Sequence, residues 1–174
     1  VLTELARTNK IVTQMGNQGA SNPLLNMIQK WIDSDAIGKV SKVQVWTNRP
    51  VWPQGGAMPP SDENLKPKDF YWDLWQGPAA STPFTPDLHP FNWRGWWDYG
   101  TGALGDVGCH LIDIPFRTLG LHYPTDAECS VADVYSQKWN ADYNPEGCPA
   151  ASFITLHFDA TPKTKSRIEL TWSD

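Results

Sequence analysis

Asp106 and His110 are the two side chains of this sequence best placed for acid–base chemistry. They lie four residues apart in a stretch, 102–119, whose apolar residues recur at helical spacing. At 3.6 residues per turn both project from one face of the predicted helix, and Asp113 lies close to that face. A carboxylate one turn from an imidazole can orient the ring and raise its basicity. His110 is therefore predicted to be a general base that works near neutral pH.

The same spacing is compatible with two further roles. The polar side chains can form an ordinary solvent-exposed helix face, with His110 paired to the carboxylate one turn before it. Asp106, His110 and Asp113 could also be metal ligands, but no second histidine and no paired cysteines accompany them. We therefore predict no metal site.

Glycines are frequent around the start of this helix, at positions 100, 102, 105 and 108. A glycine inside a helix costs about 1 kcal/mol relative to alanine, so a feature other than helix propensity favours them here. The usual reason is the close approach of another backbone segment or of a ligand. The glycines thus favour a site over a plain solvent-exposed face.

A long loop rich in tryptophan and proline precedes the helix. Seven of the ten tryptophans lie between positions 46 and 97, and nine of the fifteen prolines between 50 and 90. So many prolines without periodicity exclude regular structure for most of the loop, and so many aromatic residues argue against disorder. One interpretation is that the aromatic rings anchor the loop on itself. Another is that some of them face a cleft and stack on a sugar ring, and the two interpretations are compatible.

The remaining elements are predicted from periodicity and from turn residues. Helices are expected at 2–9, 23–35 and 102–119, the last kinked by Pro115. Strands are expected at 10–15 (short and buried), 39–48, 128–136, 151–158 and 166–173. This order predicts an α+β fold, with a mainly antiparallel open sheet packed against helices.

Composition limits the classes of function. The 174 residues carry a net charge of −5 and no block of basic residues, which argues against nucleic acid and anionic membranes as partners. No apolar run approaches the roughly 20 residues that span a bilayer. The three cysteines, Cys109, Cys129 and Cys148, indicate neither a disulfide framework nor a zinc ribbon, and whether Cys129 and Cys148 pair stays open.

Several segments together resemble the Gfo/Idh/MocA oxidoreductases. The helix Gly102-Ala-Leu-Gly-Asp-Val-Gly-Cys-His-Leu-Ile-Asp113 is similar to the family's G-x-L-x-D-x-G-x-H-x-x-D motif. Further similarity lies in Gln14–Gly19, in Ala36–Val40 and in the tryptophan-rich stretches Trp72–Ala79 and Phe91–Trp97. These segments follow the family's order over nearly the whole chain.

The resemblance implies a two-domain dehydrogenase of which this chain is the second part. Residues 1–21 would be the tail end of the nucleotide-binding domain, and 22–174 a substrate-binding domain that is incomplete at its C-terminus and resembles the family's glyceraldehyde-3-phosphate-dehydrogenase-like domain. Both ends look cut, and the N-terminal Rossmann domain is expected to lie outside the chain, because G-x-G-x-x-G and E-K-P motifs are lacking. The chain alone is expected to be inactive. Cytoplasmic location is the default and export stays open.

The resemblance also assigns roles to residues. His110 would be the acid/base or the residue that contacts the substrate hydroxyl, and Asp106 its neighbour that binds substrate and orients the ring. Trp93, Arg94 and Trp96 would help to bind a carbohydrate substrate, and Gln14, Asn17 and Gln18 would lie near the nicotinamide of NAD or NADP. The implied reaction is hydride transfer at a hydroxyl-bearing carbon of a sugar, cyclitol or glycoside, with a homo-oligomer formed through the open sheet face. The alternatives are an NAD-dependent glycoside hydrolase of the same family and a non-catalytic carbohydrate-binding or oligomerisation domain.

Overall fold

A computed structural model describes residues 1–174 and contains one four-stranded sheet. The strands are β1 (Val40–Trp46), β2 (Asp126–Ala132), β3 (Ala151–Phe158) and β4 (Thr164–Ser173), in the order β1-β4-β3-β2. β3 pairs antiparallel with both β2 and β4, whereas β1 runs parallel to β4. The predicted α+β fold is confirmed, and the sheet is mixed, with two of its three pairings antiparallel.

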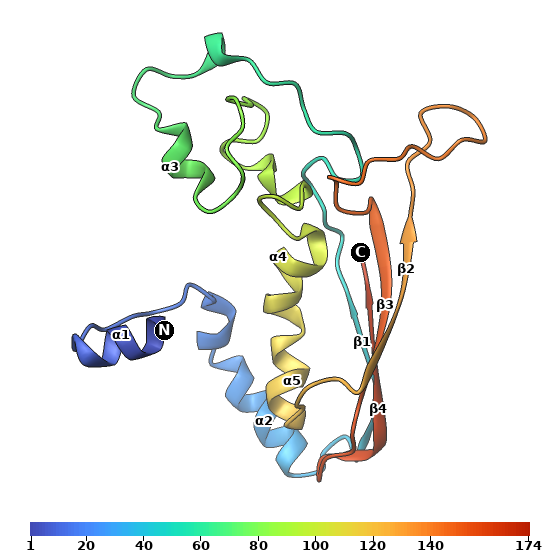
Figure 1. Cartoon of the computed structure of the whole chain (residues 1–174). Coiled ribbons are helices and arrows are strands. Elements are labelled where there is room, and N and C mark those ends of the chain that lie inside the picture. The colour runs from blue at the N-terminus through green and yellow to red at the C-terminus, as the bar shows by residue number, and fades with distance from the viewer.

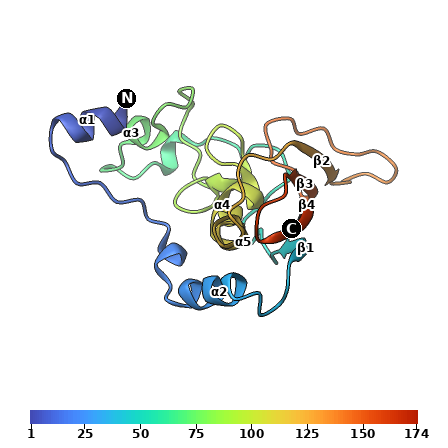
Figure 2. The same cartoon turned by 90° about the horizontal axis from the view of Figure 1, so that it is seen from below.

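Three of the helices cover one face of this sheet (Figures 1 and 2). They are α2 (Leu24–Asp33), α4 (Gly102–Leu111) and α5 (Asp113–Leu119). Ile32 of α2 and Leu119 of α5 pack against Ile168 and Leu170 of β4, which are fully buried. Since side chains alternate along a strand, Glu169, between these two residues, faces the opposite, open side of the sheet.

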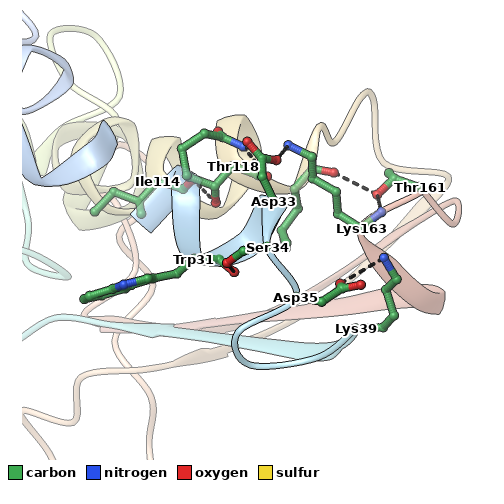
Figure 3. Close-up of polar contacts among 11 residues, drawn as sticks. Trp31, Asp33, Ser34, Asp35, Lys39, Ile114, Thr118, Thr161 and Lys163 are labelled. Carbon is green, nitrogen blue, oxygen red and sulfur yellow. Dashed lines mark hydrogen bonds and ion pairs between the residues drawn. The ribbon is translucent and has the colours of Figure 1, made fainter. Parts of the chain in front are cut away.

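Polar contacts hold α2 and α5 to the turn between β3 and β4 (Figure 3). Lys163 Nζ lies 2.6 Å from the carboxylate of Asp33 at the end of α2. This hydrogen bond, with a second one from Gln29, lowers the pKa of Asp33. Thr161 Oγ1 donates to the Leu119 carbonyl at the end of α5, at 2.8 Å. The lower end of the helical layer is thus fixed to the sheet, and α4 continues upward from it toward the long loop (Figure 1).

The predicted helix 102–119 is interrupted at Ile112, which separates α4 from α5. The interruption precedes Pro115 by three residues. Proline lacks an N–H, and its ring clashes with the carbonyl four residues earlier, here that of Leu111. The break leaves carbonyls at the end of α4 without helical partners.

The segment between β1 and α4 carries a small core of its own, made by Trp72, Phe84, Leu88 and Trp96. It contains one short helix, α3 (Trp72–Gln76), and two 3-10 turns, at Glu63–Leu65 and Asn92–Gly95. The Trp72 indole donates a 2.7 Å hydrogen bond to the Thr82 carbonyl and stacks on Trp75 at a centroid distance of 4.7 Å. The loop anchors itself through its aromatic side chains.

The N-terminal residues differ most from expectation. Helix α1 (Leu2–Thr8) forms without burying any residue, and Gln18–Ser21 forms a 3-10 turn. The predicted buried strand at 10–15 is wrong, because these residues are irregular and exposed. A strand needs a neighbour to satisfy its backbone, and no strand of the sheet lies beside this segment. The sheet's own strands match their predicted ranges closely, except that β2 ends at Ala132 instead of 136. None of the helices is both long and apolar enough to cross a membrane.

Candidate active site

A cleft of about 290 Å³ opens where the long loop meets the start of α4. Trp93, Arg94 and Trp97 line it from the loop, and Asp106 lines it from the first turns of α4. Three of the residues predicted to bind substrate therefore share one cleft. Trp97 is half exposed, so its indole is accessible to a ligand.

Arg94 and Asp106 form an ion pair in the wall of this cleft. Nε of Arg94 donates to Oδ1 of Asp106 at 2.8 Å, and Nη1 donates to the Phe91 carbonyl at 2.9 Å. The guanidinium also lies 4.5 Å from the ring centroids of both Phe91 and Trp93. Both partners are partly exposed, so water screens their attraction in part. The second carboxylate oxygen, Oδ2 of Asp106, has no hydrogen-bond partner in the protein and can accept one from a ligand.

The glycines at this junction permit close backbone contact. A Cβ at position 100 would lie 2.6 Å from backbone atoms of Arg94, and one at 95 would lie 2.1 Å from the Pro53 carbonyl oxygen. A Cβ at position 105 would collide with the Thr101 side chain. The close approach predicted from the glycine pattern is real, and at Gly100 its partner is the backbone that carries Arg94.

His110 lies one turn further along α4 and is held by Asn17. Oδ1 of Asn17 lies 2.8 Å from Nδ1 of His110, and Nδ2 of the same amide donates to the Cys109 carbonyl at 3.0 Å. This carbonyl is among those that the break before α5 leaves without helical partners. A carbonyl can only accept, so it fixes which end of the Asn17 amide faces the imidazole.

The expectation that Asp106 orients the His110 ring is not met. No hydrogen bond joins the two side chains; Asp106 pairs with Arg94, and the ring contacts Asn17. A guanidinium is a stronger partner for a carboxylate than a neutral imidazole, because its hydrogen bonds are charge-assisted. The i, i+4 spacing places both side chains on one face, as predicted, without pairing them.

Comparison with known protein families assigns this architecture. The model of the Gfo/Idh/MocA oxidoreductase family's C-terminal alpha/beta domain matches residues 22–138, about two thirds of the chain. The chain belongs to this family. A comparison with curated proteins gives no match.

The family match covers α2, β1, the long loop, α4, α5 and β2. Arg94, Asp106 and His110 therefore all lie inside the family domain. Asn17, which holds the His110 ring, lies before the matched stretch.

The other predicted site residues lie in different environments. Trp96 is 2% exposed within the loop core, and its buried indole N–H has no partner, so it offers no surface for stacking. The carboxamides of Gln14 and Gln18 are exposed, with Gln14 bonded only to the neighbouring Met15 carbonyl.

The cysteines and the acidic residues form neither a disulfide bond nor a metal site. All three cysteines are free thiols, and burial raises the pKa of Cys148 to about 11. No group of three or more His, Cys, Asp or Glu side chains is arranged to hold a metal ion.

A second hollow beside the cleft was not predicted. It is lined by Trp75 and Gln76 from α3 and by Trp93, Asp98 and Tyr99. The high tryptophan content of the loop is the sequence feature that indicates a cleft here. It does not distinguish Trp75, which lines the hollow, from Trp72, which is buried in the loop core.

Proposed function

We propose that this chain is the substrate domain of an NAD(P)-dependent dehydrogenase that oxidises a hydroxyl-bearing carbon of a sugar, cyclitol or glycoside. The observation that carries the proposal is the Asn17–His110 contact, one helical turn from the Arg94–Asp106 cleft. In a family of oxidoreductases, a partly buried imidazole held in one orientation beside a polar cleft is the arrangement that an alcohol oxidation needs.

The Asn17 amide sets the protonation of the imidazole. Because its Oδ1 faces the ring, Nδ1 of neutral His110 carries the proton and donates it to Asn17. Nε2 is then the unprotonated nitrogen and has no partner within the protein. It can take the proton of a substrate hydroxyl as the carbonyl forms, and return it in the reverse direction.

The cleft supplies the contacts that would position the substrate. Oδ2 of Asp106 can accept a hydrogen bond from a second hydroxyl, while Arg94 holds the carboxylate in place through Oδ1. The indoles of Trp93 and Trp97 offer apolar faces for the C–H side of a sugar ring. Trp96 belongs to the support of this wall.

Gln14 and Gln18 are the residues proposed to lie near the cofactor. The exposed carboxamides of Gln14 and Gln18 can exchange hydrogen bonds with the amide group of a nicotinamide. When bound, a nicotinamide supplies the hydride chemistry, which belongs to the cofactor and not to the protein. Asn17 acts on His110 instead, since both ends of its amide are already engaged. In this proposal residues 1–21 lead out of a nucleotide-binding domain that holds most of the cofactor, and the chain alone is inactive.

Cofactor reduction by the full-length protein tests the proposal. Incubation with NAD or NADP and a panel of sugars, cyclitols and glycosides should produce the absorbance of the reduced cofactor with at least one compound. Release of an aglycone that requires added cofactor, without net reduction, would instead assign the glycoside-cleaving branch. If no compound reduces the cofactor or releases an aglycone, and a His110→Ala variant gives the same result as the parent protein, the domain is a carbohydrate-binding or assembly module.

We also propose that the open sheet face pairs with a second copy of the chain. Trp46 and Phe153 both stand beside Ser173 in the strand register, so they share this face, and they are 70% and 51% exposed. Ion pairs such as Lys42–Glu169 lie on the same face and would set the pairing geometry. Light scattering should give at least a dimer, and Trp46→Glu should shift it toward monomer. A monomeric parent protein would contradict this proposal.

A further inference from the structure

The hollow next to the cleft forms a distinct compartment of about 330 Å³. Its walls are the aromatic rings of Trp75, Trp93 and Tyr99, together with Gln76, Asp98 and the short Pro78-Ala79 segment after α3. The stacking of Trp75 on Trp72 fixes the Trp75 ring, and Trp72 is itself buried in the loop core. The compartment is therefore preformed by a packed substructure.

Three residues, Trp93, Asp98 and Tyr99, line both this hollow and the cleft that holds Arg94 and Asp106. The hollow and the cleft are therefore adjacent and meet at these three residues. Each has a volume near the lower end of ligand sites, about 300 Å³, which suits one small ring. A ligand that filled both would carry two rings joined by a short link.

The polar groups of the hollow indicate what its occupant is made of. Gln76 is 5% exposed, and its buried Oε1 accepts no hydrogen bond. Its Nε2 is already engaged with Thr82 Oγ1 at 2.7 Å and Tyr99 Oη at 3.2 Å. The Asp98 side chain also has no partner in the protein. The exposed Asp98 carboxylate can accept a hydrogen bond from a ligand donor such as a hydroxyl group, whereas protein atoms cover Gln76 Oε1.

The charge of the residues that line the hollow excludes a phosphate or nucleotide group as its occupant. The lining contains no lysine or arginine, and Asp98 is acidic. A phosphate or nucleotide group would meet a carboxylate without a compensating cation, which is unfavourable. A neutral, hydroxyl-rich ring with one apolar face matches both the aromatic walls and the accessible carboxylate of Asp98.

We propose that this hollow is a second sugar subsite, so that the substrate is a disaccharide or a glycoside with a ring on each side of its glycosidic link. The inference rests on the proposed carbohydrate function: the reacting ring occupies the Arg94–Asp106 cleft, and the neighbouring ring lies against Trp75 with hydroxyls toward Asp98. The subsite selects for the length of the substrate and takes no part in the chemistry.

Calorimetric titration of the full-length protein with matched sugars tests the subsite. The pairs are glucose with cellobiose and maltose, galactose with lactose and melibiose, and mannose with mannobiose. At least one two-ring sugar should bind tenfold or more tightly than its one-ring partner. Ala79→Trp, which fills the hollow, should remove most of this advantage, and Ala57→Trp, at an exposed position of the same loop, should not. Trp75→Ala is a second variant, with circular dichroism to verify folding.

The outcomes separate this inference from the function on which it rests. Binding of one-ring sugars with no gain from a second ring overturns the subsite alone. A two-ring advantage that survives both Ala79→Trp and a folded Trp75→Ala protein also overturns it. Binding of none of these sugars overturns the subsite, and the cofactor-reduction assay with the wider panel then decides the proposed function separately.

Discussion

Asn17 and His110 are joined by a 2.8 Å contact between Oδ1 and Nδ1, although 93 positions separate them in the sequence. Asn17 follows the irregular N-terminal segment, and His110 is near the end of α4, so the contact links the first residues of the chain to the family domain. The Cys109 carbonyl orients the Asn17 amide. The ring of a side chain inside the family domain is thereby held by a residue outside the matched stretch.

Replacing Asn17 should change the tautomer of His110. In the parent chain, nitrogen NMR of the neutral imidazole should show the proton on Nδ1. Asn17→Ala should shift the ring toward a mixture dominated by the Nε2–H form, because Nδ1 then has no acceptor. Gln14→Ala, an exposed carboxamide three residues away, is the matched control and should leave the spectrum unchanged. A parent ring protonated mainly on Nε2 would refute the assignment.

Arg94 should matter for stability as well as for the site. Its guanidinium bonds Asp106 and the Phe91 carbonyl and stacks on two rings. Arg94→Ala should lower the free energy of unfolding by about 1–3 kcal/mol. This loss lies between those typical of exposed and of buried ion pairs. Arg94→Lys should recover only part of this, since an ammonium lacks the planar fork. Denaturant titration measures both. Arg49→Ala, which removes a loop arginine with no side-chain partner, is the control; equal losses in the two alanine variants would contradict the assigned role.

Gly100 should not tolerate a side chain. A Cβ there would approach the Arg94 backbone to 2.6 Å, and backbone atoms cannot rotate away. Gly100→Ala should therefore destabilise the protein by about 1–3 kcal/mol through overpacking and displace Arg94 from Asp106. Gly56→Ala, where nothing lies within 4 Å of the added carbon, should be close to neutral. Thermal unfolding of the two variants compares them directly, and equal melting temperatures would count against this packing.

Acid should weaken the open face of the sheet. Asp126 on β2 accepts a hydrogen bond from His157 on β3 and pairs with Arg167, and these contacts lower its pKa below the usual 3.8. A carboxyl with a lowered pKa contributes stability above its unfolded pKa, and this contribution is lost as pH falls through the folded value. Asp126→Asn should reduce the loss of melting temperature between about pH 5 and pH 3. Asp133→Asn, at an exposed aspartate without a side-chain partner, should leave this loss of melting temperature unchanged. An equal loss of melting temperature in the parent and Asp126→Asn proteins would show that Asp126 does not keep its contacts with His157 and Arg167 in solution.

The sequence predicts those features that local pattern determines. Alternation located β1 and β3, and helical spacing located α2, α4 and α5, because each buries one face in a common core. The family resemblance also singled out Arg94 and Asp106, which lie together in one cleft. The glycine pattern indicated close contact at the start of α4 before its partner was known.

Long-range partners could not be predicted in the same way. Apolar alternation marks a strand but does not name its neighbour, so the parallel pairing of β1 with β4 was not foreseen and segment 10–15 was assigned to a strand that does not form. The i, i+4 spacing suggested an Asp106–His110 pair because Arg94 and Asn17, the actual partners, lie outside the helix and, for Asn17, far away in sequence. Tryptophan content likewise could not separate Trp96, in the loop core, from Trp97 in the cleft wall.

The proposal that His110 is the acid/base of a dehydrogenase is tested most directly by the turnover of the full-length His110→Ala protein. With a sugar substrate and its nicotinamide cofactor, the account predicts that kcat falls about 10²- to 10⁴-fold while the fold and cofactor binding are retained. His110→Ala turnover within a factor of two of the parent protein, on a substrate that the parent oxidises, would contradict it.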